Sequence, residues 1–238
     1  MSRPGLVAFL ERFRVESEAV WARYHEQTLA DFRSTGVGGS DWKQGTRWKR
    51  GLNSAEITAI EDAQRIEFPA DYRTFLSVLN APDRPSLRFG FKGAQIAQAA
   101  DANIFTDWAQ PSDQHLAYGA LQSGITFDVE KAALWPATWG DRPTSAKARA
   151  ERLSILLEAA PRLIRVQGHR FMVSGLDLSP TPVLSVHQSD VIVYAWSIEE
   201  MLVKDFSELT QQTTDAPENT DQRIAQLARL PFWSDILG

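Results

Sequence analysis

The feature that most constrains this fold is a pair of β-rich runs after Pro161, each divided in two by a short turn. The first reads LIRVQGHRFMVS and turns near Gly168-His169, and the second reads VLSVHQSDVIVYA and turns at Gln188-Ser189-Asp190. Runs of β-branched and aromatic residues on both sides of such turns are typical of β-hairpins. The pattern predicts two consecutive hairpins, followed by a short helix that Ser197 and Glu200 begin as a capping box.

Helical patterns account for much of the remaining chain. Apolar residues at helical spacing predict one or two helices up to about residue 33, before a Gly- and Ser-rich loop over residues 34–46. Asn53 and Glu56 can form the capping box of a further helix, and Pro69 suits the first position of the next one. Because helices and strands occur in separate runs, the sequence predicts an α+β fold rather than a parallel α/β sheet.

Composition and charge narrow the classes of function. The 238 residues include no cysteine, which excludes disulfides, thiolate metal sites and a cysteine nucleophile. The net charge of −5 argues against direct nucleic-acid binding, which favours a basic surface. Charged residues interrupt the N-terminal apolar run and no window resembles a membrane span, so we expect a cytoplasmic protein without membrane contact.

Searches for catalytic motifs leave one pair of acids. The four histidines are far apart in sequence, and the patterns of zinc proteases, phosphate-binding loops and serine hydrolases are absent. In TFDVEKA, Asp128 and Glu130 are two residues apart on a predicted strand, so both carboxylates would leave by one face. Such a pair could flank a water as acid and base, or could face solvent or a neighbouring arginine for structural reasons.

The turn at residues 187–190 has two interpretations. A nucleophile interpretation needs His187 to activate Ser189, with an acid behind the histidine. The alternative is a plain hairpin corner, because Ser and Asp side chains bond nearby backbone groups in turns. Residues two apart across a tight turn rarely align for proton transfer, so the sequence favours the corner. It predicts no catalytic residue, no cofactor and no metal site.

Several segments, taken in order, resemble the SUKH superfamily, in the branch of the fungal cell-wall assembly regulator and its bacterial relatives. They are GLNSAEITAIEDAQRIEFPADYRTFLSVLNAP, GITFDVEKAALWPATWGDRP, APRLIRVQGHRF, TPVLSVHQSDVIVYA and PFWSDIL. The resemblance runs from Gly51 to Gly238 and departs from the family pattern at Arg165, His187 and Ala195. It divides the chain into an N-terminal helical extension with its loop, residues 1–50, and a SUKH-like domain, residues 51–238.

The resemblance implies a central, mainly antiparallel sheet packed against helices, and a binding function without catalysis. Bacterial members are regarded as immunity proteins that neutralise polymorphic toxins, often nucleases, by covering their active surface. We therefore expect an intracellular protein-binding module with a basic toxin domain as its partner. A regulatory or scaffold protein without a toxin is the alternative, and a hydrolase built on Asp128, Glu130 and His169 is a third. The oligomeric state stays open.

Residues in or beside the predicted loops are the candidates for a binding face, because loops carry function more often than cores do. Aromatic and arginine side chains are favoured anchors of protein interfaces. Trp139 is one of eight tryptophans and is followed by a GDRP turn, although an indole is also a good core residue. The predicted binding residues are Trp139, Arg142, His169, Arg170 and Asp190.

Overall fold

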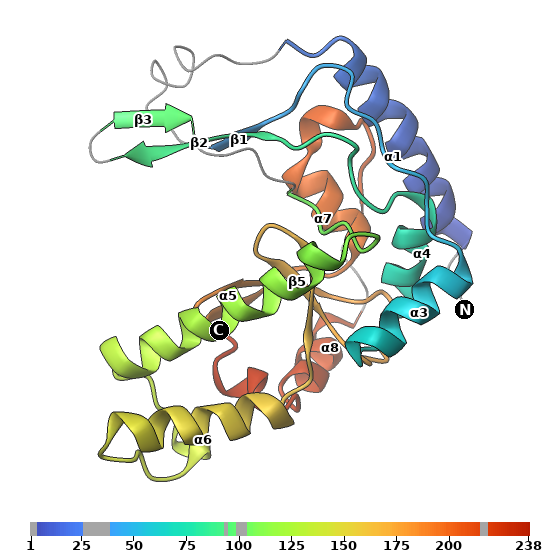
Figure 1. Ribbon diagram of the computed structural model, residues 1–238. Helices are drawn as coiled ribbons and strands as arrows, with labels where there is room; N and C mark the ends of the chain where they lie inside the picture. Colours follow the sequence, from blue (N-terminus) through green and yellow to red (C-terminus); the bar gives the residue numbers. More distant parts are fainter. Residues whose placement is uncertain (1–3, 26–38, 93–94, 99–103, 215–218) are drawn as a thin grey trace.

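The computed structural model describes residues 4–25, 39–92, 95–98, 104–214 and 219–238, which form the predicted α+β fold (Figure 1). Its helices are α1 (Pro4–Ala22), α3 (Ser54–Gln64), α4 (Ala70–Val78), α5 (Pro111–Lys131), α6 (Ala146–Ala159), α7 (Ile198–Asp205) and α8 (Thr220–Leu227). Short 3-10 turns are η1 (Ala137–Trp139), η2 (Ser207–Leu209) and η3 (Trp233–Asp235). The strands are β1 (Gly39–Asp41), β2 (Leu87–Lys92), β3 (Gln95–Gln98), β4 (Leu163–Gln167), β5 (Arg170–Val173), β6 (Val183–His187) and β7 (Asp190–Ala195).

The two predicted hairpins are confirmed and build a four-stranded antiparallel sheet in the order β4-β5-β6-β7. Other parts of the chain cover both of its edges. On the β4 side, the amide of Thr106 donates to the carbonyl of Val166 at 3.1 Å. On the β7 side, the amide of Gly238 donates to the carbonyl of Val191 at 2.8 Å. Covered edges protect a sheet from pairing with other chains.

A second, three-stranded antiparallel sheet has the order β1-β2-β3. Its central strand, β2, consists of the residues LRFGFK, in which large apolar residues alternate with others. Strand β1 lies inside the predicted loop over residues 34–46, so that prediction was wrong for residues 39–41. The reason is tertiary: Ser40 pairs with Arg88, forty-eight residues away, and no local pattern signals such a pairing. The predicted helical residues 26–33 lie outside the described residues.

The main sheet separates two hydrophobic cores because side chains alternate across it. Ile164, Met172 and Val183 point into a core shared with α1, α4 and α7. Phe171, Leu184 and Val186 point into a second core closed by α5, α6 and the C-terminal segment. Figure 1 shows this division, with α1, α4 and α7 on one side of the sheet and α5, α6 and α8 on the other.

Helix α1 contributes four fully buried side chains to the first core: Leu6, Leu10, Phe13 and Trp21. Trp48 joins α1 to the rest of this core, with ring centroids 6.1 Å from Phe13 and 5.0 Å from Phe105. The N-terminal helix therefore packs on the same core as the predicted domain. The proposed division at residue 50 stays a prediction.

The predicted capping box is confirmed at α3 and is present only in part at α7. At α3, Asn53 Oδ1 accepts the amide of Glu56 at 2.9 Å, and the Glu56 carboxylate accepts the amide of Asn53 at 2.8 Å. At α7, Ser197 Oγ accepts the amide of Glu200 at 3.1 Å, but Glu200 reaches back to the amide of Trp196 rather than to that of Ser197. Pro69 precedes α4 as its N-cap instead of occupying its first position.

The strand predicted from Ile125 was wrong, because residues 111–131 form the single helix α5. Leu121, Ile125 and Val129 recur every four residues and are all buried, which is the spacing of a helix face. The alternation of Ile125, Phe127 and Val129 suggested a strand, but the Phe127 side chain is 53% exposed. Every short apolar alternation carries this ambiguity of period.

Candidate functional site

The helical conformation of α5 sends the two candidate carboxylates in different directions. Residues two apart on a helix differ by about 200° around its axis, so they cannot flank one water as two residues of one strand face would. Glu130 forms a two-pronged ion pair with Arg149, at 2.7 and 2.9 Å, and the Arg149 hydrogen bonds lower the pKa of Glu130. The prediction of a shared face for Asp128 and Glu130 was therefore wrong.

Asp128 fixes the hairpin turn on which the nucleophile interpretation depended. Its Oδ2 atom accepts both the amide of Ser189, at 2.9 Å, and the Ser189 hydroxyl, at 2.7 Å. Asp128 is only 8% exposed. The turn is the predicted hairpin corner, and the Ser189 hydroxyl is held by a carboxylate of α5 rather than by His187.

Two of the predicted binding residues, Trp139 and Arg142, lie apart from the hairpin turns. Trp139 is 1% exposed; its ring stacks on Phe232 at 4.9 Å, and its Nε1 donates to Asp235 at 2.9 Å. It belongs to the second core, whereas the predicted role needs it at the surface. Arg142 is exposed, and its Nη2 donates to the carbonyl of Val129 at 2.7 Å, which ties the GDRP turn to α5.

The other three predicted binding residues come together at the turn end of the main sheet. Antiparallel pairing of β5 with β6 places the turn before Arg170 beside the turn at His187 and Asp190. The amide of Val186 donates to the carbonyl of His169 at 2.9 Å, which joins the two turns. His169 and Asp190 are exposed here. Burial lowers the pKa of His169, and the nearby Arg170 lowers it further, whereas Asp205 acts in the opposite direction.

Arg170 itself is enclosed by partners. Its guanidinium carbon lies 3.4 Å from the ring centroid of Tyr194, and its Nη1 donates to Ser185 Oγ at 2.9 Å. Its Nε donates to Asp205 at 3.3 Å, and the Tyr194 hydroxyl donates to the same carboxylate. The Arg170 side chain is 12% exposed. This cluster therefore serves mainly to join α7 to the sheet, with the exposed His169 and Asp190 beside it.

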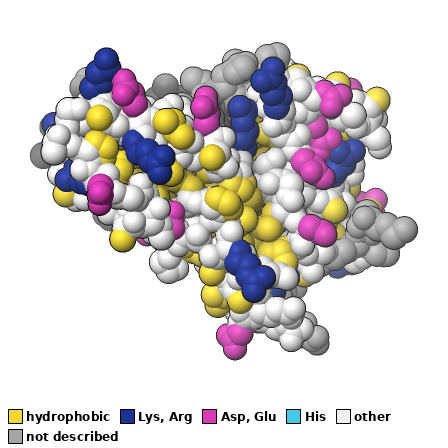
Figure 2. Space-filling model, turned by 90° about the horizontal axis from the view of Figure 1, so that it is seen from below, with side chains coloured by type: hydrophobic (Ala, Val, Ile, Leu, Met, Phe, Trp, Pro, Cys, Tyr) yellow, Lys and Arg dark blue, Asp and Glu magenta, His cyan; other side chains and the backbone are white. Residues whose placement is uncertain are grey.

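A cleft of about 770 Å³ lies between α3, the start of α4 and the loop after β5. Four acids and one base line it: Glu61, Asp62, Glu67, Asp177 and Arg73. Asp62, Glu67 and Asp177 are exposed, whereas Glu61 is 9% exposed and is paired with Arg73. Figure 2 shows one face of the molecule, where acidic side chains lie on both sides of a band of hydrophobic ones.

Hydrogen bonds hold together the segments that line the cleft. Ser174 Oγ accepts the amide of Glu67 at 2.8 Å, and the amide of Gly175 donates to the carbonyl of Glu67 at 2.9 Å. The Glu61 carboxylate accepts the amide of Phe68 at 2.8 Å. Ile66 and Leu176 add half-buried apolar surface to the lining. The cleft is therefore a preformed acidic depression with an apolar component.

Sequence reasoning missed this cleft because its two walls are far apart in the chain. Glu61, Asp62 and Glu67 lie close together in AIEDAQRIEFP, which was a visible acidic signal. Asp177 reaches them only through the pairing of Glu67 with Ser174 and Gly175, more than one hundred residues away. A local pattern cannot predict that contact.

The described residues contain no group of three or more His, Asp or Glu side chains placed to hold a metal ion. No helix in the described part of the chain is long and apolar enough to cross a membrane. Comparisons of the chain with family models, curated proteins and solved structures find no match.

Proposed function

We propose that this chain is a protein-binding module that captures a basic segment of a partner protein in the acidic cleft. The observation that carries the proposal is the placement of Asp62, Glu67 and Asp177 around one preformed depression. Three exposed carboxylates beside the internally paired Glu61 and Arg73 leave an excess of negative charge there. A potential of one sign, focused in a cleft, attracts partners of the opposite sign.

The lining suits the side chains of lysine and arginine. These residues bury an aliphatic stem on apolar surface while the charged head stays among polar groups. Ile66 and Leu176 supply apolar surface, and the three carboxylates supply acceptors. Since hydrogen bonds already fix the cleft, binding does not have to order it first, which reduces the entropic cost of association.

The identity of the partner rests on the sequence resemblance. SUKH-like bacterial chains imply a toxin as partner, and a basic nuclease-type toxin would match the charge of the cleft. In this proposal, capture of a basic segment covers the surface with which the toxin would bind its own anionic substrate. Complementary charge of this kind accelerates association and weakens as salt is added.

Co-expression tests the proposal in cells. A basic nuclease-type toxin domain, the partner proposed above, is expressed with the wild type or with the triple variant Asp62→Asn, Glu67→Gln, Asp177→Asn. We expect the wild type to protect the cells and to co-purify with the toxin, and the triple variant to lose most of both effects. The matched control, Asp141→Asn, Glu151→Gln, Glu158→Gln, removes the same charge at exposed sites away from the cleft and should still protect. Equal protection by both triple variants would refute the role of the cleft.

A further inference from the structure

A second depression lies directly beside the acidic cleft. This amide pocket has a volume of about 450 Å³, and its lining includes the exposed residues Ser179, Gln222 and Gln226. The loop after β5 borders both depressions, because residues 175–177 line the acidic cleft and residues 178–180 line the amide pocket. Since one continuous loop passes from the first lining to the second, the two depressions are neighbours on the surface.

The loop is fixed on the side of the amide pocket as it is beside the cleft. The amide of Thr181 donates to the buried carboxylate of Asp71, in α4, at 2.8 Å. From α8, the side chain of Arg223, which is 6% exposed, donates to the carbonyl of Pro180. Buried hydrogen bonds therefore hold α8 and the loop together, so the amide pocket is preformed like the cleft.

The two glutamines are spaced to bind the backbone of an extended peptide. Gln222 and Gln226 are four residues apart on α8, so they lie on one face of the helix, about 6 Å apart along its axis. In an extended peptide, backbone groups that point to the same side recur at every second residue, about 6.6 Å apart. A glutamine amide carries an acceptor and two donors, so it can bond both the C=O and the N–H of one such residue.

We infer that the segment captured by the acidic cleft continues in an extended conformation across the loop into the amide pocket, where Gln222 and Gln226 bind its backbone. This inference rests on the proposed function of the cleft. Residues 175–180 cover at most roughly 17 Å, so about five extended residues are enough to reach both depressions. Because the glutamines bond main-chain groups, the extension needs no particular side chains, whereas the cleft requires a basic one.

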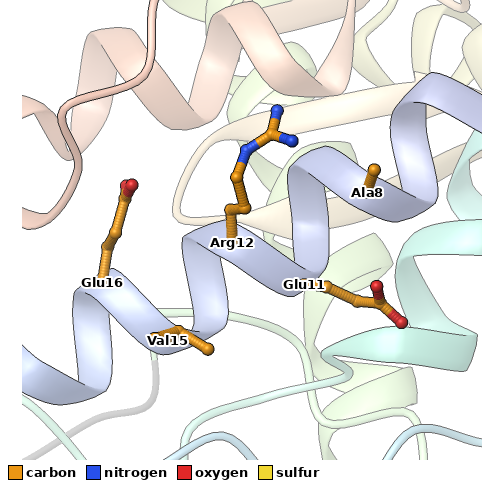
Figure 3. A pocket seen from close by; sticks show the side chains of 5 residues that line it. All are labelled: Ala8, Glu11, Arg12, Val15 and Glu16. Atoms are coloured by element: carbon orange, nitrogen blue, oxygen red, sulfur yellow. The ribbon is translucent and has the colours of Figure 1, made fainter.

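A third depression, of about 420 Å³, lies on α1 and shares no described lining residue with the other two. Figure 3 shows its residue Glu11 on one side of the helix, and Arg12 and Glu16 on the other. Glu11 is exposed. Glu11→Gln therefore removes a carboxylate from a different depression, and it serves as the control for unspecific attraction of basic peptides.

Fluorescence anisotropy at low salt tests the inference with three labelled peptides, each acetylated and amidated at its ends. They are Lys-Arg-Lys, the same tripeptide followed by Ala-Thr-Ala-Thr, and the same tripeptide preceded by Ala-Thr-Ala-Thr. We expect one of the two long probes to bind the wild type at least tenfold more tightly than the tripeptide does. The double variant Gln222→Ala, Gln226→Ala should remove this gain and leave the affinity for the tripeptide unchanged, and Glu11→Gln should behave as the wild type.

A fourth probe tests the recognition of the backbone without any variant. Methylation of the backbone nitrogens in the Ala-Thr-Ala-Thr extension removes their hydrogen-bond donors, so the gain in affinity for the wild type should disappear. Long probes that bind no more tightly than the tripeptide, or a gain that survives in the glutamine double variant or with the methylated probe, would overturn the inference and leave the proposed function standing.

The tripeptide alone tests the proposed function. A tripeptide that does not bind the wild type, or that binds equally well when Asp62, Glu67 and Asp177 are neutralised, would refute capture by the cleft and with it the inference. Equal thermal midpoints of the wild type and the variants verify that the variants are folded.

Discussion

Asp128 in α5 and Ser189 in the β6–β7 turn are joined by two hydrogen bonds, of 2.9 and 2.7 Å, to one carboxylate oxygen. Gly124 lies one helical turn earlier on the same face of α5, and a side chain there would come within 3.2 Å of the Gln188 backbone. Helix α5 therefore rests directly on the turn. An acid and a serine that could have been taken for chemistry instead connect a helix to a hairpin.

Removing that carboxylate should destabilise the fold. Asp128→Ala leaves the Ser189 amide and hydroxyl without their acceptor in a largely buried place, and such a loss costs about 1–3 kcal/mol. Urea unfolding at pH 7 measures the change. Ser189→Ala removes one of the two bonds and should cost less than Asp128→Ala. Equal stability of wild type and Asp128→Ala would contradict the structural role given to this residue.

Gly51 should tolerate no side chain. A Cβ atom at position 51 would lie 1.8 Å from the carbonyl oxygen of Ser77. The two backbone segments are held together there by a hydrogen bond of 2.8 Å from the Leu52 amide to the Leu76 carbonyl. We expect Gly51→Ala to destabilise the chain by about 3 kcal/mol, the upper part of the range for overpacked sites. Gly5→Ala is the control, since a Cβ there meets nothing within 4 Å. Thermal unfolding of both variants should show a loss for Gly51→Ala only.

The capping box of α3 should give a defined pH dependence. The hydrogen bonds from Arg50, and then that from the Asn53 amide, lower the pKa of Glu56 to about 2. Because the pKa is lower in the folded chain, the carboxylate stabilises the fold above the ordinary carboxyl pKa, and this contribution disappears as the pH falls towards 2. The stability difference between wild type and Glu56→Gln should therefore be constant near neutrality and shrink below about pH 4.5. NMR titration of the Glu56 carboxyl gives the pKa directly, and an ordinary value would refute the predicted shift.

Trp139 should behave as a core residue. Trp139→Ala removes the stack on Phe232 and the bond to Asp235, and large aromatic truncations in cores cost about 3–5 kcal/mol. Trp139→Phe keeps a ring in place and should cost less. Denaturant unfolding distinguishes this outcome from that of a surface anchor, whose truncation would leave stability within about 0.5 kcal/mol of the wild type.

The sequence predicted correctly those helices and hairpins that depend on residues close together in the chain. The hairpins followed from β-branched runs around Gly168 and Gln188, and α3 followed from the Asn53–Glu56 box, because each depends on neighbours in the chain. The strand prediction for residues in α5 was wrong because a short alternation of apolar residues fits the period of a strand and also that of a helix. Only the length of the helix and the burial of Ile125 and Val129 decide between them.

The candidate site depended on contacts that no local pattern contains. Asp177 lies near Glu61 and Glu67 because Glu67 is hydrogen-bonded to the Ser174 hydroxyl and to the Gly175 amide, more than one hundred residues away. Arg170 was predicted as a surface residue from its position beside a turn, yet Tyr194 and Asp205 enclose it, and neither partner could be assigned from the sequence. His169 and Asp190 are exposed at one end of the sheet, because the turns that connect strands lie on the surface of a protein.

The most direct test of the account is the affinity of the purified chain for the proposed kind of partner, a basic nuclease-type toxin domain, measured by calorimetry at low and at high salt. The wild type should bind tightly at low salt and weaken as salt rises, and the control triple variant at residues 141, 151 and 158 should follow it closely. Neutralising Asp62, Glu67 and Asp177 together should reduce the low-salt affinity at least tenfold and flatten the salt dependence. Binding by that cleft variant as tight and as salt-sensitive as that of the wild type would contradict the account.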